Sequence, residues 1–309
     1  MWNYVIPHFN QFLSDLQLEP KHRTDAEGKA ERIAKSLFAK YYPNQLVFDP
    51  NCYLVVGSYG KGNATQPCTD LDMFFVLPDE VCGRISRLQG NRQSQLLQEV
   101  KSALSITFPR TDLSADGQIV LCPFETYSVE VVPVFRLNEP GLFLTPHTGD
   151  GGSWRTSNPY AEYQHLRAAD QLTNMKATHL TMMAKAWKRQ CSVELKSVSL
   201  EVLASNFVSQ WQHKEQTVFY YDWMIRDFFA FLFPYINGRT RIIGTEEWIE
   251  LGDSWQTKLQ TAYNCALKAC EYEKQDDGLN AALEWQKIFG NQLSASAHYI
   301  SLFAKMQAV

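Results

Sequence analysis

The apolar positions of this chain follow two different periods, and the change from one to the other divides the sequence. In the stretch that begins with Asp70 and Asp72, every second side chain is apolar (Leu71, Met73 and Phe75), and this period of two predicts a buried strand. Because side chains alternate across a strand, both carboxylates face the same side, about 7 Å apart at their Cα atoms. The apolar run before this stretch predicts a second strand, and a turn of small residues and a polar loop join the two.

The first half of the chain mixes strands with helices. A capping-box pattern from Thr24 to Glu27 predicts the start of a helix that ends before Pro43 and packs across the back of a sheet. Further strands are predicted at 52–56, 117–121 and 127–135, and a helix at 93–104. Residues 136–154 contain many prolines and glycines and predict a loop that passes between two lobes.

The second half of the chain has the helical period throughout. Asn158 and Pro159 can cap and start the first helix, because proline is tolerated in a first turn. Further helices are predicted around 180–189, from 196, over 218–233, around 263–270 and over 281–289. The sequence therefore predicts an α+β, two-lobed fold with a mixed sheet in its first lobe. We expect a catalytic lobe with an N-terminal packing helix at 1–157 and a helical lobe at 158–309.

Composition narrows the class of protein. With 45% apolar and 20% charged residues, the 309-residue chain is an ordinary globular protein, long enough for one bilobal enzyme. Its net charge of −4 argues against strong nucleic-acid binding, because nucleic-acid-binding domains are usually basic. Residues 1–4 lack the basic start of a signal peptide, and no apolar run is as long as a membrane span. The seven cysteines include no CxxC pair, so we expect free thiols in a reducing cytoplasm.

The strongest candidate site combines the two strand acids with the turn that precedes them. Two anions beside a core are costly unless a cation lies between them, and carboxylate oxygens suit Mg²⁺, which also leaves room for substrate phosphates. Gly57 permits close approach of the backbone, and the Ser58 hydroxyl with free amides can hold phosphate oxygens. A simple turn and a solvated strand edge would explain each motif alone. Together, Gly57-Ser58 and Asp70-x-Asp72 predict a phosphoryl-transfer site.

A third acid, Glu130, is embedded in the otherwise apolar strand predicted at 127–135. A buried glutamate should be neutral or paired, and the alternative is a glutamate that faces water at a strand edge. A two-metal site needs a further oxygen ligand from an adjacent strand. We therefore expect Glu130 to join Asp70 and Asp72.

Two residues of the predicted helical lobe are candidates for phosphate binding. A triphosphate held between two lobes needs a cation from the helical side, and Lys185 is the best placed lysine. Ser197, at the start of a predicted helix, offers a hydroxyl and backbone amides. The alternative is a helix with an apolar core face and a solvated basic face, which describes most such helices.

A Gly-Ser turn followed by Asp-x-Asp on a strand resembles the nucleotidyltransferase superfamily with the polymerase-β-like fold. Other stretches narrow the resemblance to the cGAS/DncV-like nucleotidyltransferases (CD-NTases), mostly bacterial enzymes that make cyclic oligonucleotide signals. These stretches are residues 57–61, 70–72, 116–120, 129–135, 150–154, 158–159, 184–187, 196–197 and 247–255. The metal motif is common to the superfamily, so the interlobe and C-terminal stretches favour this branch.

The resemblance implies a role for each candidate residue. Asp70, Asp72 and Glu130 would be catalytic ligands of two Mg²⁺ ions, which Mn²⁺ could replace. The NTP substrates, ATP or GTP or both, would be bound by Gly57, Ser58, Lys61, Lys185 and Ser197. The third acid is more often aspartate in the family, so Glu130 places its oxygen one methylene further out.

The resemblance implies an enzyme that makes a cyclic oligonucleotide second messenger in bacterial anti-phage signalling, with an activating ligand or partner protein. Two alternatives stay open. The first is a linear, template-independent transferase that tails RNA or modifies a small molecule or protein, which the acidic balance of the chain disfavours. The second is a non-catalytic nucleotide-binding partner protein, which the retention of all three acids disfavours.

Overall fold

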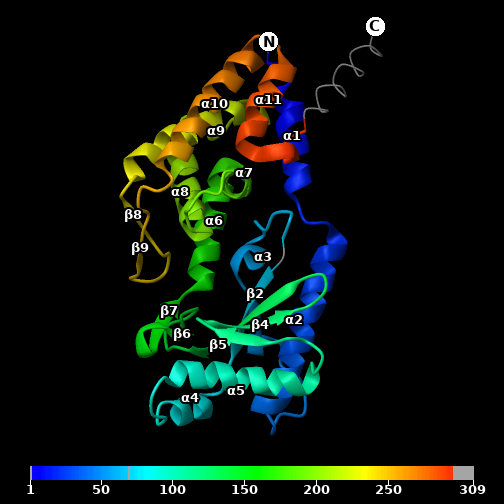
Figure 1. The fold of residues 1–309 in the computed structure, drawn as a ribbon, viewed down its shortest axis with the longest axis vertical. Helices are drawn as coiled ribbons and strands as arrows, with labels where there is room; N and C mark the ends of the chain where they lie inside the picture. Colours follow the sequence, from blue (N-terminus) through cyan, green and yellow to red (C-terminus); the bar gives the residue numbers. More distant parts are fainter. Residues whose placement is uncertain (1, 69, 295–309) are drawn as a thin grey trace. The chain divides into compact units, whose positions relative to one another are not determined.

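The computed structural model describes residues 2–68 and 70–294, and these form two compact units (Figure 1). One unit is Leu18–Tyr163, and the other consists of the described residues of 1–17 and 164–309. The compact units therefore meet at 17/18 and 163/164 in the sequence. The boundary at 157/158 between a catalytic lobe and a helical lobe stays a prediction. The first helix, α1 (Val5–Leu16), belongs with the second, helical unit.

The unit Leu18–Tyr163 is organised around a mixed sheet, as the sequence predicts. Its described strands are β1 (Tyr53–Val55), β2 (Asp70–Val76), β3 (Ser114–Asp116), β4 (Ile119–Pro123), β5 (Ser128–Arg136), β6 (Phe143–His147) and β7 (Ser153–Ser157). The order is β1-β2-β5-β4-β3, and β6 pairs with both β5 and β7. Only β2 and β5 run parallel to each other among these pairs. This parallel pair is central, and it carries all three predicted acids.

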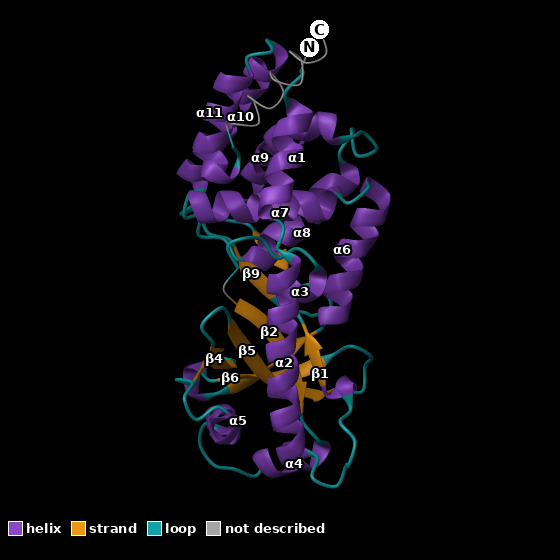
Figure 2. Cartoon of the chain, turned by 90° about the vertical axis from the view of Figure 1, so that its right-hand side faces the viewer, coloured by secondary structure: helices purple, strands orange, loops and turns teal. Residues whose placement is uncertain are grey.

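Helices cover one face of this sheet. Figure 2 shows α2 (Pro20–Tyr41) lying over β1, β2 and β5, and α5 (Arg92–Thr107) packs against α2 and the sheet. The buried positions of β2, Leu71, Met73 and Phe75, point into this helix-covered cluster. At about 1.5–3 kcal/mol for each large apolar side chain removed from water, this face stabilises the unit most. The unit also contains α3 (Gly57–Lys61) and the short helix α4 (Asp79–Ile85).

Helix α2 begins earlier than the capping-box pattern predicts. Its first residue is Pro20, preceded by Glu19 in an extended conformation. Thr24 lies inside the helix, where its hydroxyl donates to the carbonyl of Pro20 at 3.1 Å. The prediction of a cap at Thr24 was wrong because Pro20 supplies the fixed φ of a first helical turn.

The prediction of a loop over 136–154 was also wrong. Strand β6 lies inside this range and pairs with β5 and β7, while β7 begins at its end. The glycines of this segment form the connections: Gly141 precedes β6, and Gly149 to Gly152 separate β6 from β7. The prolines and glycines therefore predicted the turns correctly, but the short strands between these turns were not predicted.

The helical unit is the second half of the chain with α1 added. Its helices are α1, the end of α6 (Pro159–Thr173), α7 (Lys176–Gln190), α8 (Ser197–Gln210), α9 (Tyr221–Leu232), α10 (Gln256–Lys274) and α11 (Gly278–Phe289). A small hairpin of β8 (Arg239–Arg241) and β9 (Trp248–Glu250) completes the described part. Trp187, Trp255 and Trp285 are fully buried in its core. Figure 1 shows α10 and α11 side by side, as their extensive packing requires.

The described residues contain neither a membrane-spanning helix nor a disulfide bond. Across residues 2–68 and 70–294, no helix has both the length and the apolar character needed to cross a bilayer. All seven cysteines lie in this described part, and none of them forms a disulfide.

Candidate active site

The site is built on the parallel pair β2 and β5. The register of the two strands places Asp72 directly opposite Glu130, and Asp70 opposite Ser128. One carboxylate oxygen from each of Asp70, Asp72 and Glu130 lies within 4.8 Å of the others. The sequence predicts this convergence, and the parallel register explains it, because equal steps along two neighbouring strands keep side chains on a common face.

The acids share their face of the sheet with a small apolar cluster. Further along β2 and β5, Phe74, Val76, Val132 and Val134 occupy the same face, and Phe143 of β6 packs against them. The acids stand near the starts of both strands, where this cluster ends. Asp70 is exposed, and Asp72 and Glu130 are half-buried. The three carboxylates therefore lie between the apolar cluster and the solvent.

The three acids form a cluster of neighbouring negative charges, and the positive charge of Lys61 only partly opposes their effect on Asp72. Burial and the charges of Glu130 and Asp70 raise the pKa of Asp72 to about 7. Burial and the charge of Asp70 also raise the pKa of Glu130, although a hydrogen bond from Asp72 opposes that shift. A proton shared between Asp72 and Glu130 therefore relieves part of the repulsion. A divalent cation among the three oxygens would relieve it more fully.

The turn before α3 lies against Asp72. Gly57 has a φ of +59°, and a β-carbon there would lie 2.0 Å from Asp72 Oδ2. The Val56 amide donates to the carbonyl of Asp72 at 2.9 Å, which holds the turn to the strand. Ser58 is the second residue of α3 and is half-buried. The glycine is thus required both for its backbone conformation and for close approach to a carboxylate.

Lys61, the last residue of α3, is held by a partner that sequence reasoning missed. Its Nζ atom lies 2.8 Å from Glu162 Oε2, and their side chains are 9% and 17% exposed. Glu162 stands in the first turn of α6, 101 residues further along the chain, and no local pattern marks it. A role for Lys61 toward a nucleotide stays a prediction, and a phosphate at Lys61 would compete with this carboxylate.

Lys185 and Ser197 lie in the helical unit. Lys185 is half-buried on α7, and Ser197 is the first residue of α8. Lys188 Nζ lies 3.3 Å from Ser197 Oγ, and burial lowers the pKa of this lysine. The structure thus pairs Ser197 with Lys188, a lysine that the sequence marked only as basic. The predicted phosphate contacts of Lys185 and Ser197 stay predictions.

A family model described as the Second Messenger Oligonucleotide or Dinucleotide Synthetase domain (SMODS) matches residues 4–170 of the chain. Among proteins of curated function, none matches the sequence.

Solved structures share the fold over nearly the whole chain. One is the Vibrio cholerae DncV cyclic AMP-GMP synthase in complex with the linear intermediate 5′ pppA(3′,5′)pG. It shares 12% sequence identity with this chain, with a TM-score of 0.71, and the match covers 94% of this chain and 97% of the DncV chain. Bradyrhizobium diazoefficiens CdnG in complex with GTP is 12% identical with a TM-score of 0.66, covering 95% and 97%. CdnC from E. coli MS115-1, in a complex with HORMA-deltaN, is 16% identical with a TM-score of 0.63, covering 93% and 96%.

Proposed function

Because the chain belongs to the family of Second Messenger Oligonucleotide or Dinucleotide Synthetase domains, as its resemblance to the CD-NTases predicts, we propose that it joins NTPs into a cyclic oligonucleotide in a Mg²⁺-dependent reaction. The observation that carries this proposal is the convergence of Asp70, Asp72 and Glu130 beside the Gly57-Ser58 turn. Three neighbouring acids repel one another and so destabilise the fold. A non-catalytic nucleotide-binding protein would have this destabilisation without any use for the acids.

The residues fit divalent cations. Three carboxylates within 4.8 Å offer hard oxygen ligands, and the pKa of Asp72 is raised by burial and by the neighbouring acids, whose repulsion a cation would relieve. Asp70 and Asp72 would hold both of two Mg²⁺ ions, and Glu130 would be a ligand of one of them. When bound, such ions lower the pKa of an attacking hydroxyl and stabilise the charge on a departing pyrophosphate.

The protein's own contribution is to bind and orient the nucleotides. In the proposed reaction a ribose hydroxyl attacks the α-phosphate of a donor NTP, and the bond to pyrophosphate breaks as the new P–O bond forms. Gly57 and Ser58 hold the donor triphosphate beside Asp72, while Lys185 and Ser197 bind it from the helical unit. A second transfer, with the linear intermediate turned round in the same pocket, closes the ring. The complex of the related DncV with a linear intermediate supports this order of events.

ATP and GTP are the proposed substrates, since structures of relatives contain them: CdnC was solved with ATP and CdnG with GTP. An activating partner or ligand is part of the proposal, because CdnC was solved in complex with a HORMA protein. A role in anti-phage signalling in the cytoplasm follows from the family resemblance and completes the proposal.

Product analysis tests the proposal. The purified chain is incubated with Mg²⁺ and four NTPs, one labelled at its α-phosphate, without primer, and the products are treated with phosphatase. We expect a phosphatase-resistant product whose mass fits a cyclic oligonucleotide. The double variant Asp70→Asn/Asp72→Asn should lose at least about 100-fold in rate, since loss of an outer-shell partner alone costs about 10–100-fold.

The matched control is Glu125→Gln, which neutralises an exposed acid of the same unit and should leave the rate unchanged. A product that phosphatase degrades, or one that forms only on an added RNA, would instead support the linear transferase. Equal activity in the double variant and the wild type would refute the assignment of the acids.

A further inference from the structure

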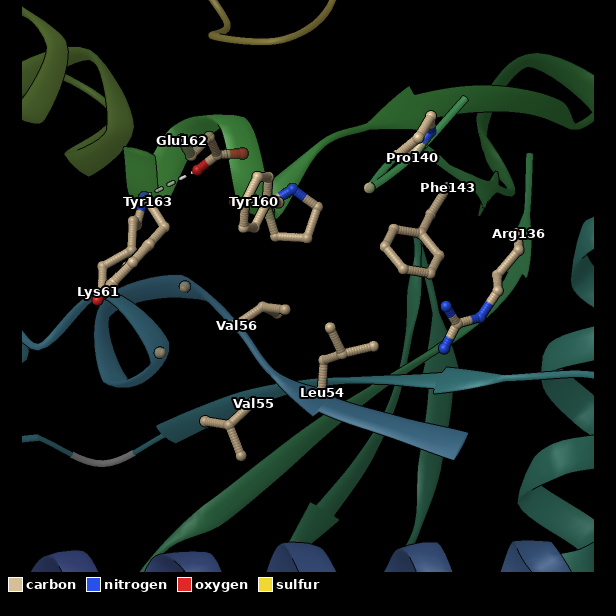
Figure 3. Close-up of a pocket in the computed structure, with 14 residues that line it drawn as sticks. Leu54, Val55, Val56, Lys61, Arg136, Pro140, Phe143, Tyr160, Glu162 and Tyr163 are labelled. Atoms are coloured by element: carbon tan, nitrogen blue, oxygen red, sulfur yellow. Dashed lines mark hydrogen bonds and ion pairs between the residues drawn. The ribbon is translucent and has the colours of Figure 1, made fainter. Parts of the chain in front are cut away.

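A pocket of about 630 Å³ opens in the unit Leu18–Tyr163, apart from the three acids (Figure 3). Strand β1 and helix α3 form one wall, β6 and the loop before it form another, and the first turn of α6 closes the third side. Its volume falls within the range of about 300–1,000 Å³ that is usual for small-molecule sites. The proposed metal ligands and Ser58 do not line this pocket, whereas Gly57 and Lys61, two of the residues predicted to bind the nucleotide, lie in its wall.

The walls of the pocket are apolar and aromatic. Leu54 and Val56 line the side formed by β1, and Figure 3 shows Phe143 and Tyr160 facing them across the pocket. Tyr160 is 62% exposed, although it stands where a ring could stack on a flat ligand. Such walls favour a planar aromatic group, because ring-on-ring contacts add to the removal of apolar surface from water.

The two ends of the pocket differ in charge (Figure 3). At one end lies the Arg136 guanidinium, which donates to the carbonyl of Asn51 at 2.9 Å and lies 5.8 Å from the centre of the Phe143 ring. Among the described residues, no carboxylate pairs with it. At the other end lies the neutralised pair of Lys61 and Glu162. Arg136 therefore leaves one end positive, and its planar fork suits a carboxylate or a phosphate.

The pocket is formed in advance, since its loop wall is fixed to α6. A β-carbon at Gly141, which has a φ of +78°, would lie 3.0 Å from Asn158 Oδ1 and 3.1 Å from Tyr160 Cβ. Asn158 Oδ1 also accepts from the amide of Ala161 at 2.9 Å, which caps the same helix. A ligand would therefore meet walls already in place and would not bear the cost of ordering a loop.

The pocket and the three acids share helix α3 as a wall. Gly57, Gly60 and Lys61 line the pocket, while the same Gly57 touches Asp72 on the other side. The helix is also pressed against β1, because a β-carbon at Gly60 would lie 2.4 Å from the carbonyl oxygen of Val55. A ligand in the pocket would thus contact the element that places Ser58 and bounds Asp72.

We propose that this pocket is a second, regulatory binding site for a planar aromatic molecule that carries a carboxylate or a phosphate. The ring lies between Leu54 and Tyr160, and the acidic group pairs with Arg136. Occupancy fixes α3 and so changes the rate of nucleotidyl transfer, a part of the inference that rests on the proposed function. The binding itself does not depend on that function.

Three fluorescent probes test binding to the 309-residue chain: 2-naphthoate, 2-naphthyl phosphate and the uncharged 2-naphthylmethanol. Each is titrated in the presence of Mg²⁺ and a saturating non-hydrolysable ATP analogue, which fills the substrate site. We expect at least one acidic probe to bind at least ten times more tightly than the alcohol. The stronger of the two acidic probes identifies the natural acid as a carboxylate or a phosphate.

Variants place the probe in the pocket. Arg136→Gln should raise the Kd of the acidic probe about tenfold and leave that of the alcohol within twofold. Leu54→Trp, which fills the pocket, should abolish the binding of all three. Arg110→Gln removes an exposed arginine of the same unit elsewhere and should change nothing.

Failure of both acidic probes to bind the wild type below millimolar concentration would overturn the proposal. Equal binding by Arg136→Gln would do the same, and so would displacement of the probe by the ATP analogue, since the pocket would then be part of the substrate site. The regulatory part is tested by turnover of NTPs with and without saturating probe. An unchanged rate in an active enzyme would refute regulation while leaving the binding site in place.

Discussion

Gly57 and Asp72 are in contact at the centre of the site: a β-carbon on the glycine would lie 2.0 Å from the carboxylate oxygen Oδ2. The contact joins the turn that would hold a triphosphate to the strand that would hold its metal ions. Since the Val56 amide also donates to the Asp72 carbonyl, turn and strand are fixed as one piece. The geometry of this piece would set how far a phosphate bound at the turn lies from the acids.

A methyl group at position 57 should damage the site. Gly57→Ala forces an L-residue to a φ of +59° and drives its β-carbon into Asp72, so either the turn or the carboxylate must move. We expect the free energy of unfolding to fall by about 1–3 kcal/mol and the rate of product formation to fall more than tenfold. Urea denaturation and the NTP assay measure both effects.

The control for this substitution is Gly28→Ala. Gly28 is exposed in the middle of α2, and a β-carbon there meets nothing within 4 Å. Because alanine is the better helix former, this variant should gain about 0.5–1 kcal/mol and keep full activity. Equal behaviour of the two variants would show that contact with Asp72 is unimportant.

Neutralising Asp72 should stabilise the metal-free protein. Burial and two neighbouring acids make its charge unfavourable, so Asp72→Asn should raise the free energy of unfolding by about 1–3 kcal/mol in EDTA at pH 8. The wild type should gain stability when Mn²⁺ is added, whereas the variant should not. Thermal unfolding with and without Mn²⁺ measures both. A variant that loses stability in EDTA would contradict this account of the acids.

The length of the third acid should affect how the protein binds metal. Glu130→Gln keeps the size of the side chain and removes its charge, so we expect a loss of activity of at least about 100-fold. Glu130→Asp keeps the charge but withdraws the oxygen from Asp72 by one methylene, so activity should return only at higher Mg²⁺ concentration. Titration of the initial rate with Mg²⁺ separates these outcomes. Full activity of Glu130→Gln at any Mg²⁺ concentration would exclude Glu130 as a ligand.

Asp222, buried on α9, should make stability depend on pH. Burial raises its pKa from 3.8 to about 7, so the folded protein binds a proton that the unfolded chain releases above about pH 4. The stabilisation is therefore complete below pH 4 and is lost as the pH rises toward 7. Asp222→Asn should remove this slope and be more stable than the wild type at pH 8, by up to about 4 kcal/mol, since (7 − 3.8) × 1.36 ≈ 4.

Urea denaturation between pH 4 and 8 checks this prediction. The control Glu215→Gln changes an exposed acid of the same unit and should retain the wild-type slope. If Asp222→Asn keeps the wild-type slope, the pH dependence of the free energy of unfolding must come from other buried groups.

The sequence predicted the parts of the molecule that depend on local patterns. The period of two after Asp70 placed both aspartates on one face, and the apolar run around Glu130 predicted the neighbouring strand. The convergence of the three acids then followed, because a parallel register sets Asp72 against Glu130. The cap of α6 at Asn158 was predicted for the same local reason.

What the sequence could not predict depends on contacts between distant residues. Strand β6 is a strand because β5 and β7 pair with it, and its Pro146 and flanking glycines suggest a loop when seen alone. The partnership of Lys61 with Glu162 joins residues 101 positions apart. The pocket likewise brings Leu54, Phe143 and Tyr160 together from three elements, so no stretch of sequence carries its signature.

The central claim is that Asp70, Asp72 and Glu130 together hold a pair of divalent cations, and electron paramagnetic resonance of bound Mn²⁺ tests it most directly. The chain is titrated with Mn²⁺ in the presence of a non-hydrolysable ATP analogue, alongside the Asp70→Asn/Asp72→Asn variant. We predict two Mn²⁺ ions per wild-type chain with the spin coupling expected at about 3.5–4 Å separation, and loss of that coupling in the variant. One uncoupled ion per wild-type chain, or the same spectrum from both proteins, would contradict the account.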